Sequence, residues 1–306
     1  MIERLAAAIA GRGRWILIAG LAIGLASPAA AAAIQPHVGP LVIAVLFLAM
    51  LKIGPQAFRI GRRDMTRSLG ITLVFQMALP CAAAVLFLML GILDRPLALG
   101  TVLILTAAPI TGAAPIAAMA GGDPAPALRQ TILGTALLPL TVLPVFALAP
   151  AFGDTSAILG TALRLLIIIG LCAAAAFALR KTGAAAKAPS LIDAASAILL
   201  ALVVIGLMSA AADALRQSPA QLALTLAFVS VLAFGLQAVL LCLWPGTSGA
   251  IPLAVAAGNR NVALFLGVLP APATTDLLLV IGCYQIPMYL TPLILPRLAA
   301  WTHPSR

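Results

Sequence analysis

Charged residues are scarce in this sequence. Only 8% of its 306 residues are Asp, Glu, Lys or Arg, while 63% are hydrophobic, against about 25% charged residues in an ordinary soluble domain. Because no water-soluble fold can cover so much apolar surface, a soluble enzyme is excluded. The net charge of +10 does not indicate nucleic-acid binding either, since the cations stand in short gaps between apolar runs rather than on one polar face.

Residues that carry enzymatic chemistry are also few. The two histidines, His37 and His303, lie outside the apolar runs, and no run contains a Ser–His pair, paired aspartates or a His/Glu metal pattern. The four cysteines each lie alone, without the spacing of a metal site or a disulfide framework. We therefore expect no catalytic residue, metal site or cofactor. A selective channel is disfavoured because no run offers a filter-like segment.

Long apolar runs dominate what is present. About 20 helical residues cross a hydrocarbon core about 30 Å thick, and ten runs approach or exceed that length. No linker or polar block separates them, so residues 1–306 are expected to form a single transmembrane domain in the lipid bilayer. The predicted spans cover residues 15–33, 39–53, 68–92, 97–120, 128–149, 157–179, 191–212, 222–243, 250–269 and 276–295.

The loop charges predict an orientation. Lys and Arg accumulate on the cytoplasmic side of membranes, and here they cluster before the first span, around the second connection and in the sixth. We expect a multi-pass protein of the cell (inner) membrane with both termini in the cytoplasm. The N-terminal segment also fits a secretory signal peptide, because small residues at 27–31 follow an apolar run. Cleavage there would leave nine spans.

The fourth and ninth spans are interrupted. Pro109, Gly112 and Pro115 break the fourth, and Gly258 followed by residues 259–261 breaks the ninth. Proline and glycine leave backbone groups without helical partners, which lipid does not tolerate unless a cavity or protein surrounds them. Matching interruptions indicate a transport site near the midplane. The alternative is that they are kinks and close-packing residues.

An even number of spans also suggests two halves. Each interrupted span is the fourth of five, so residues 15–150 and 157–297 fit two five-helix repeats of opposite topology. The predicted fold is an all-α polytopic membrane protein of about ten helices.

Arg260 is the most informative single residue. A cation at a helix centre costs at least about 2.5–3.5 kcal/mol on insertion scales and by default marks a functional site. Asn259 and Asn261 bring two more polar groups to the same depth. The alternative is that Arg260 snorkels to an interface. Gln76, Thr111 and Thr135 are weaker candidates, which either bind a solute or ion or bond a neighbouring helix.

Two strings carry a resemblance to a known family. The sequence PITGAAPIAAMAGGD at residues 109–123 and AAGNRNVAL at residues 256–264 resemble the fourth- and ninth-helix signatures of the bile acid:sodium symporter family, and the likeness covers nearly the whole chain. It implies two inverted repeats, a panel domain and a core domain where the broken helices cross, and alternating-access transport of a small organic anion. Gln76, Thr111, Thr135 and Asn261 match the family's polar positions.

Other positions depart from the family pattern. Ala113 and Ala114 stand where well-studied carriers have Ser and Asn, Ala256 replaces a Glu that serves both sodium ions, and Arg260 replaces a Gln. These changes raise the local charge by about two units, which disfavours a bound cation. The sodium ligands are thus only partly present, and we expect Arg260 to take the role of a bound sodium and attract an anionic substrate. The alternative function is a non-transporting membrane receptor or scaffold.

Overall fold

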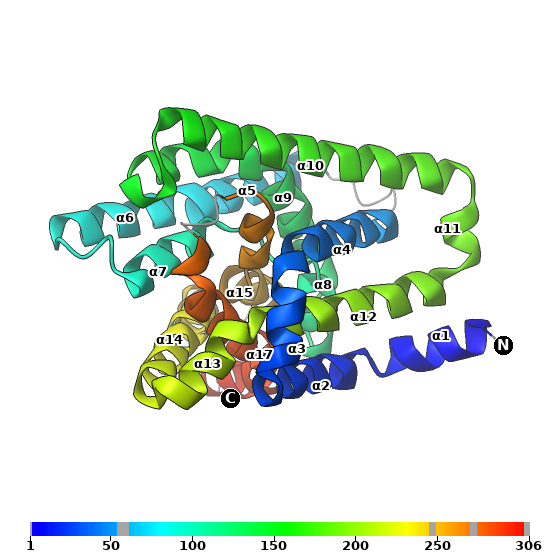
Figure 1. Ribbon diagram of the computed structural model, residues 1–306. Helices are drawn as coiled ribbons and strands as arrows, with labels where there is room; N and C mark the ends of the chain where they lie inside the picture. Colours follow the sequence, from blue (N-terminus) through cyan, green and yellow to red (C-terminus); the bar gives the residue numbers. More distant parts are fainter. Residues whose placement is uncertain (1, 54–60, 245–248, 270–273, 303–306) are drawn as a thin grey trace.

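The computed structural model describes residues 2–53, 61–244, 249–269 and 274–302. Every regular element in these ranges is a helix, and they contain no strand (Figure 1). A helix satisfies its own backbone hydrogen bonds, which a chain in lipid requires. Seven helices are long and apolar enough to cross a membrane, or eight if a bent N-terminal pair counts as one. The chain is therefore an all-α, multi-pass membrane protein.

The first half of the chain runs from α1 to η4. Its elements are α1 (Ile2–Gly11), α2 (Gly13–Ala26), α3 (Pro28–Ile34), the 3-10 helix η1 (Gln35–His37), α4 (Val38–Lys52), α5 (Arg62–Leu73), the π-helix η3 (Val74–Ala78), α6 (Leu79–Met89), α7 (Pro96–Thr106), α8 (Ala113–Met119), α9 (Pro124–Ala147) and the 3-10 helix η4 (Pro150–Phe152).

The second half runs from α10 to α17. Its elements are α10 (Thr155–Lys181), α11 (Ala184–Lys187), α12 (Pro189–Leu207), α13 (Ser209–Gln217), α14 (Pro219–Leu243), α15 (Ala250–Gly258), the 3-10 helix η5 (Val262–Gly267) and α17 (Leu278–Thr302).

Eight of the ten predicted spans coincide with a helix or a broken helix, but the boundary between the first two is wrong. We expected a connection at residues 34–38, whereas helix continues from Pro28 to Lys52 and the break lies at Ser27. The Ser27 hydroxyl caps the new helix by accepting from the Ala30 N–H at 3.4 Å, and Pro28 takes the first helical position, where its missing N–H costs nothing. The preceding helices, α1 and α2, meet at an angle of 72°.

The Gly121-Gly122-Asp123 string has a structural explanation. Gly121 has a φ of +83°, a left-handed conformation that glycine adopts without strain. A Cβ on Gly122 would lie 2.8 Å from the Ile251 side chain, so the string also lets α15 approach. The Asp123 carboxylate caps α9, accepting from the Ala125 N–H at 2.9 Å.

The helices pack into two groups. In one, α12 contacts α1, α2, α3 and α4, and α10 contacts α4. In the other, α9 contacts α5, α8 and α15, while α14 contacts α15 and α17. Figure 1 shows α15 in the interior of the molecule, with α14 and α17 at one end and α10 running along the opposite side. The groups meet where α9 contacts α10 and where α4 contacts η5.

Large apolar side chains cover the outer surface. Met89 is 81% exposed and Val231 is 73% exposed. Such side chains lower the free energy when they face hydrocarbon and raise it when they face water. The outward surface therefore agrees with a bilayer environment, and the polar residues that could bind a solute are the buried ones.

Candidate functional site at the crossing of the interrupted helices

The two interrupted segments meet through their backbones. Pro109 and Arg260 form an antiparallel bridge, in which the Ile110 N–H donates to the Asn259 carbonyl at 2.9 Å and the Asn261 N–H donates to the Ala108 carbonyl at 2.8 Å. Backbone N–H and carbonyl groups that lack helical partners at one interruption are thus hydrogen-bonded by those at the other. Two runs about 150 residues apart in sequence are joined into one unit at this crossing.

Arg260 is held at the crossing by backbone carbonyls. Its side chain is part of the buried core, with a residue exposure of 2%. The guanidinium donates from Nε to the Ala257 carbonyl at 2.9 Å, from one Nη to the Ala107 carbonyl at 3.1 Å, and from the other to the Phe75 carbonyl at 3.5 Å. It also lies 5.9 Å from the centre of the Phe75 ring, within cation–π range. Arg260 therefore does not snorkel to an interface.

The ends of two helices account for this buried charge. Ala107 is the residue that closes α7, and Ala257 lies in the last turn of α15. A helix C-terminus carries about half a negative charge, so two of them together approach one unit. Among the described residues no carboxylate forms an ion pair with Arg260, and the helix ends take that role.

Buried hydroxyl and amide groups complete the crossing. The Tyr284 hydroxyl donates to the Gly258 carbonyl at 2.7 Å and accepts from the Arg260 backbone N–H at 3.2 Å. The Asn259 amide oxygen accepts from the Thr291 hydroxyl at 2.9 Å, and that hydroxyl accepts from Gln237 at 3.1 Å. Helices α14 and α17 thus fix the broken end of α15.

Gln76 is placed by a π-helix. Such single-turn insertions are rare and frequent at functional sites, and η3 lies between α5 and α6. The Gln76 amide nitrogen donates to the Gly134 carbonyl at 2.8 Å and to the Thr141 hydroxyl at 2.9 Å, while its amide oxygen has no partner among the described residues. With Arg260, Gln76 lines a small cavity of ≈ 10 Å³.

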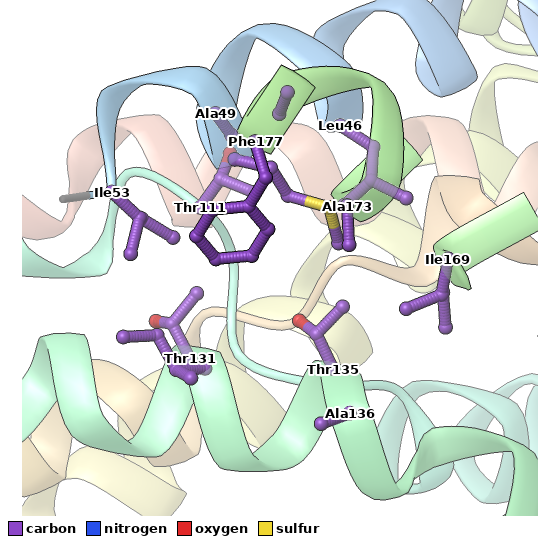
Figure 2. A pocket seen from close by; sticks show the side chains of 13 residues that line it. Leu46, Ala49, Ile53, Thr111, Thr131, Thr135, Ala136, Ile169, Ala173 and Phe177 are labelled. Carbon is purple, nitrogen blue, oxygen red and sulfur yellow. The ribbon is translucent and has the colours of Figure 1, made fainter. Parts of the chain in front are cut away.

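A larger cavity lies between the two helix groups. Its volume is ≈ 200 Å³, and most of its lining is apolar. Figure 2 shows Thr131 and Thr135, one turn apart on α9, facing Leu46 of α4 and Phe177 of α10 across the cavity. Thr111, from the break in the fourth span, joins them. Three hydroxyl groups in an apolar enclosure suit an organic solute with few polar atoms.

The remaining predicted residues lie either at the crossing of the interrupted helices or beside the larger cavity. Asn261 and Thr111 line a third cavity of ≈ 30 Å³ together with Arg260, so Thr111 connects the crossing with the larger cavity. Gly258 ends α15, where a Cβ would lie 2.5 Å from the Ala233 carbonyl. Gly112 precedes α8 as its cap, and a Cβ there would make only an ordinary contact with the Ile116 side chain, at 3.9 Å.

One predicted helix break is wrong. Pro115 lies inside α8, which begins at Ala113. Proline is tolerated in the first turn of a helix because the N–H it lacks would have no partner there. The interruption is consequently shorter than expected and falls on residues 107–112, with Pro109 at its centre.

Sequence reasoning missed several residues of the site. Tyr284 and Thr291 lie in the tenth span and Gln237 in the eighth, and each is a polar residue inside an apolar run. That signal was present, but it does not show which helix faces the crossing. Phe75 contributes its carbonyl because of the π-helix, which no sequence pattern indicates.

No protein-family model matches the chain, and no curated protein matches it. The resemblance to the bile acid:sodium symporter family therefore stays a prediction from the two sequence strings.

Proposed function

We propose that this protein is a secondary transporter that moves a small organic anion across the cell (inner) membrane by alternating access. The observation that carries the proposal is the backbone pairing of two interrupted helices beside a cavity between two helix groups. Broken helices that meet are how transporters build polar sites within a bilayer. A purely structural kink would require no partner from the other half of the chain.

The architecture we propose has ten spans in two inverted repeats, with both termini in the cytoplasm. The group with α4, α10 and α12 is the panel domain, and the group with α9, α14, α15 and α17 is the core domain. Among the described residues, one polar bond between the groups is donated by the Arg164 guanidinium to the Val268 carbonyl at 3.2 Å. Rocking of one group against the other would open the larger cavity to either side.

The cavity lining supports the choice of substrate class. Its apolar walls fit a hydrocarbon body, and the hydroxyls of Thr111 and Thr135 can donate to a carboxylate or sulfonate. The Thr131 hydroxyl already donates within the protein, to the Ala127 carbonyl at 3.0 Å or the Ile110 carbonyl at 3.3 Å. The positive charge of Arg260 lies one cavity away, since Thr111 lines both. We propose that substrate binds through the threonines while Arg260 sets the sign of the local potential from behind them.

The crossing supports transport without sodium. The Arg260 guanidinium occupies the carbonyl groups that a metal ion would need, and its fixed charge opposes a second cation nearby. In this proposal the Arg260 guanidinium supplies the positive charge that a coupling ion would otherwise bring, and it stays bound throughout the transport cycle.

Flux measurements test the proposal. Purified protein in vesicles would be offered radiolabelled monocarboxylates and sulfonates of increasing chain length, with external sodium replaced by potassium or choline. We expect saturable uptake that is the same in all three salts, and strict dependence on sodium would contradict it. Arg260→Gln should abolish uptake of the anion and leave uptake of its neutral amide analogue largely intact. Binding without any flux would instead favour the receptor or scaffold alternative.

A further inference from the structure

A separate polar cavity lies where three helices begin. Its volume is ≈ 50 Å³, and none of the residues discussed at the crossing lines it. Helix α5 starts at Arg62, α9 at Pro124 and α15 at Ala250, and the residues that line the cavity lie within the first three turns of α5, the first two turns of α9 and the start of α15. The lining consists of Asp64, Arg67, Ser68, Ile71, Pro126, Arg129, Gln130, Gly249 and Leu253.

The charge of this cavity is positive. Arg67 and Arg129 outnumber the single acid, Asp64. The Asp64–Arg129 ion pair has 3.9 Å between the carboxylate oxygen and the nearer Nη, which is too long for a hydrogen bond. The pair offsets one positive charge, so the lining keeps a net charge of one unit, and Arg129 gains no acceptor from Asp64. The N-terminal ends of the helices add partial positive charge from unpaired N–H groups.

Arg129 also has a buried donor without an acceptor. Its Nε is inaccessible and has no hydrogen-bond partner among the described residues, although its side chain is 25% exposed. Neighbouring Gln130 is satisfied, because its amide oxygen accepts from Thr72 at 2.9 Å and its amide nitrogen donates to the Ser68 carbonyl at 3.2 Å. A buried charged donor left unpaired is unfavourable and calls for a ligand that accepts hydrogen bonds.

We propose that this cavity binds a phosphate group through Arg67 and Arg129. About 10–15 Å³ of such cavity volume holds one water molecule, so ≈ 50 Å³ admits a group of a few heavy atoms, the size of a phosphate. A phosphate oxygen is the acceptor that a guanidinium bonds most strongly. Asp64 and Arg67 are exposed and form the mouth, while Ser68 and Gln130 are buried and form the floor.

The phosphate can come from a lipid headgroup or from solution. The cavity lies at the basic end of α5, where Arg62 and Arg63 are also exposed, and such clusters attract anionic headgroups at the membrane surface. Both sources offer the same oxygens to Arg129, and the two arms of the experiment separate them.

A bound phosphate would hold the elements of the crossing together. Ile71, Gln130 and Leu253 line both this cavity and the small one that Arg260 and Gln76 share. Bridging α5 and α9 beside the start of α15 would therefore stabilise the packing around the crossing. The site goes beyond the proposed transport function and does not depend on it.

Thermal unfolding of the full chain tests the site. In detergent, inorganic phosphate would be compared with chloride at equal ionic strength. In a second arm without free phosphate, detergent-solubilised phosphatidylglycerol would be compared with diacylglycerol of the same acyl chains, because phosphatidylcholine carries the same phosphate group. We expect at least one of the two ligands to raise the unfolding midpoint in a saturable way, because selective binding stabilises by mass action. A response to phosphate identifies a soluble ligand, and a response to phosphatidylglycerol alone identifies the lipid. No response to either overturns the proposal.

Matched variants distinguish a site from diffuse charge attraction. Arg129→Gln and Arg67→Gln should each weaken binding about tenfold or more, since bonds to a charged group are lost. Arg62→Gln removes the same charge from the same helix but lies outside the cavity, and it should bind as the wild type does. Equal losses in Arg62→Gln and Arg67→Gln would overturn the proposal. Because Arg67 is exposed, its variant tests binding even if Arg129→Gln fails to fold.

Discussion

Replacing Arg260 by alanine tests whether its guanidinium stabilises the C-terminal ends of α7 and α15 by bonding their carbonyls. The change removes the donors to the Ala107 and Ala257 carbonyls, at 3.1 and 2.9 Å, and a longer contact of 3.5 Å to Phe75. It leaves the backbone bridge between the interrupted segments in place, since that bridge uses N–H and carbonyl groups alone.

The expected cost follows from the orphaned carbonyls. Each buried acceptor left without a donor costs about 1–3 kcal/mol, so two short bonds give about 2–6 kcal/mol. The long contact to Phe75 adds little. Relief from burying a charge reduces the total, which is why replacing buried ions can be neutral when the new side chain packs well. Alanine does not fill the space, and we therefore expect net destabilisation of at least about 2 kcal/mol.

Chemical rescue is the sharpest assay. Thermal unfolding of Arg260→Ala would be measured in detergent with and without millimolar guanidinium chloride, far below denaturing concentrations, and with sodium chloride as the salt control. Free guanidinium should enter the vacated space, bond the two carbonyls and restore part of the lost stability. Arg260→Met fills the same space with an apolar side chain, so it should show no rescue.

Two results would refute this reasoning. One is an Arg260→Ala protein that unfolds within about 1 kcal/mol of the wild type, which would mean that the helix ends need no cation. The other is equal stabilisation of wild type and variant by guanidinium, which would mean that the ion acts elsewhere.

Three further predictions concern single residues. Gly134→Ala places a Cβ 2.8 Å from the Gln76 amide oxygen and should destabilise the fold by about 1–3 kcal/mol, whereas Gly160→Ala, with nothing within 4 Å, should unfold like the wild type in the same thermal scan. Thr135→Val keeps the shape of the cavity but loses a hydroxyl, so uptake assays should show a KM raised about fivefold with unchanged stability. Hydrogen bonds from the α10 backbone and Ser156 lower the pKa of Asp154. Its capping contribution is therefore present at neutral pH and is lost as pH falls through that lowered pKa. Asp154→Ala should lower the unfolding midpoint at pH 7, and this difference from the wild type should shrink as acid protonates the carboxylate; a difference of constant size would show that the charge is irrelevant.

The positions of the long helices could be predicted from sequence because apolar runs of about 20 residues have one solution in lipid. The interruptions were equally visible, since proline and glycine act locally. The misplaced boundary between the first two spans has the same local origin. Ser27 followed by Pro28 starts a helix. Pro36, where we expected the connection, lies in a 3-10 turn that continues the same helical direction.

The tertiary part of the site could not be predicted. Hydropathy along α17 does not reveal that Tyr284 faces Gly258, because the apolar residues of that helix are spread around all its faces. The π-helix at Gln76 shifts the register by a fraction of a turn, and the apolar periodicity of the span does not predict this shift. The cavity at Arg129 depends on three helix starts from distant parts of the chain, a convergence that only the fold supplies.

The backbone pairing at Pro109 and Arg260 has a consequence for how this site can change over evolutionary time. Main-chain groups form it, so substitutions at Thr111 or Asn261, which line the cavities, leave the backbone pairing in place. The lining can thus acquire a new substrate preference through single codon changes without first inventing a new way to hold two broken helices together. The residues that set selectivity can therefore change while the backbone pairing that holds the two helices stays the same.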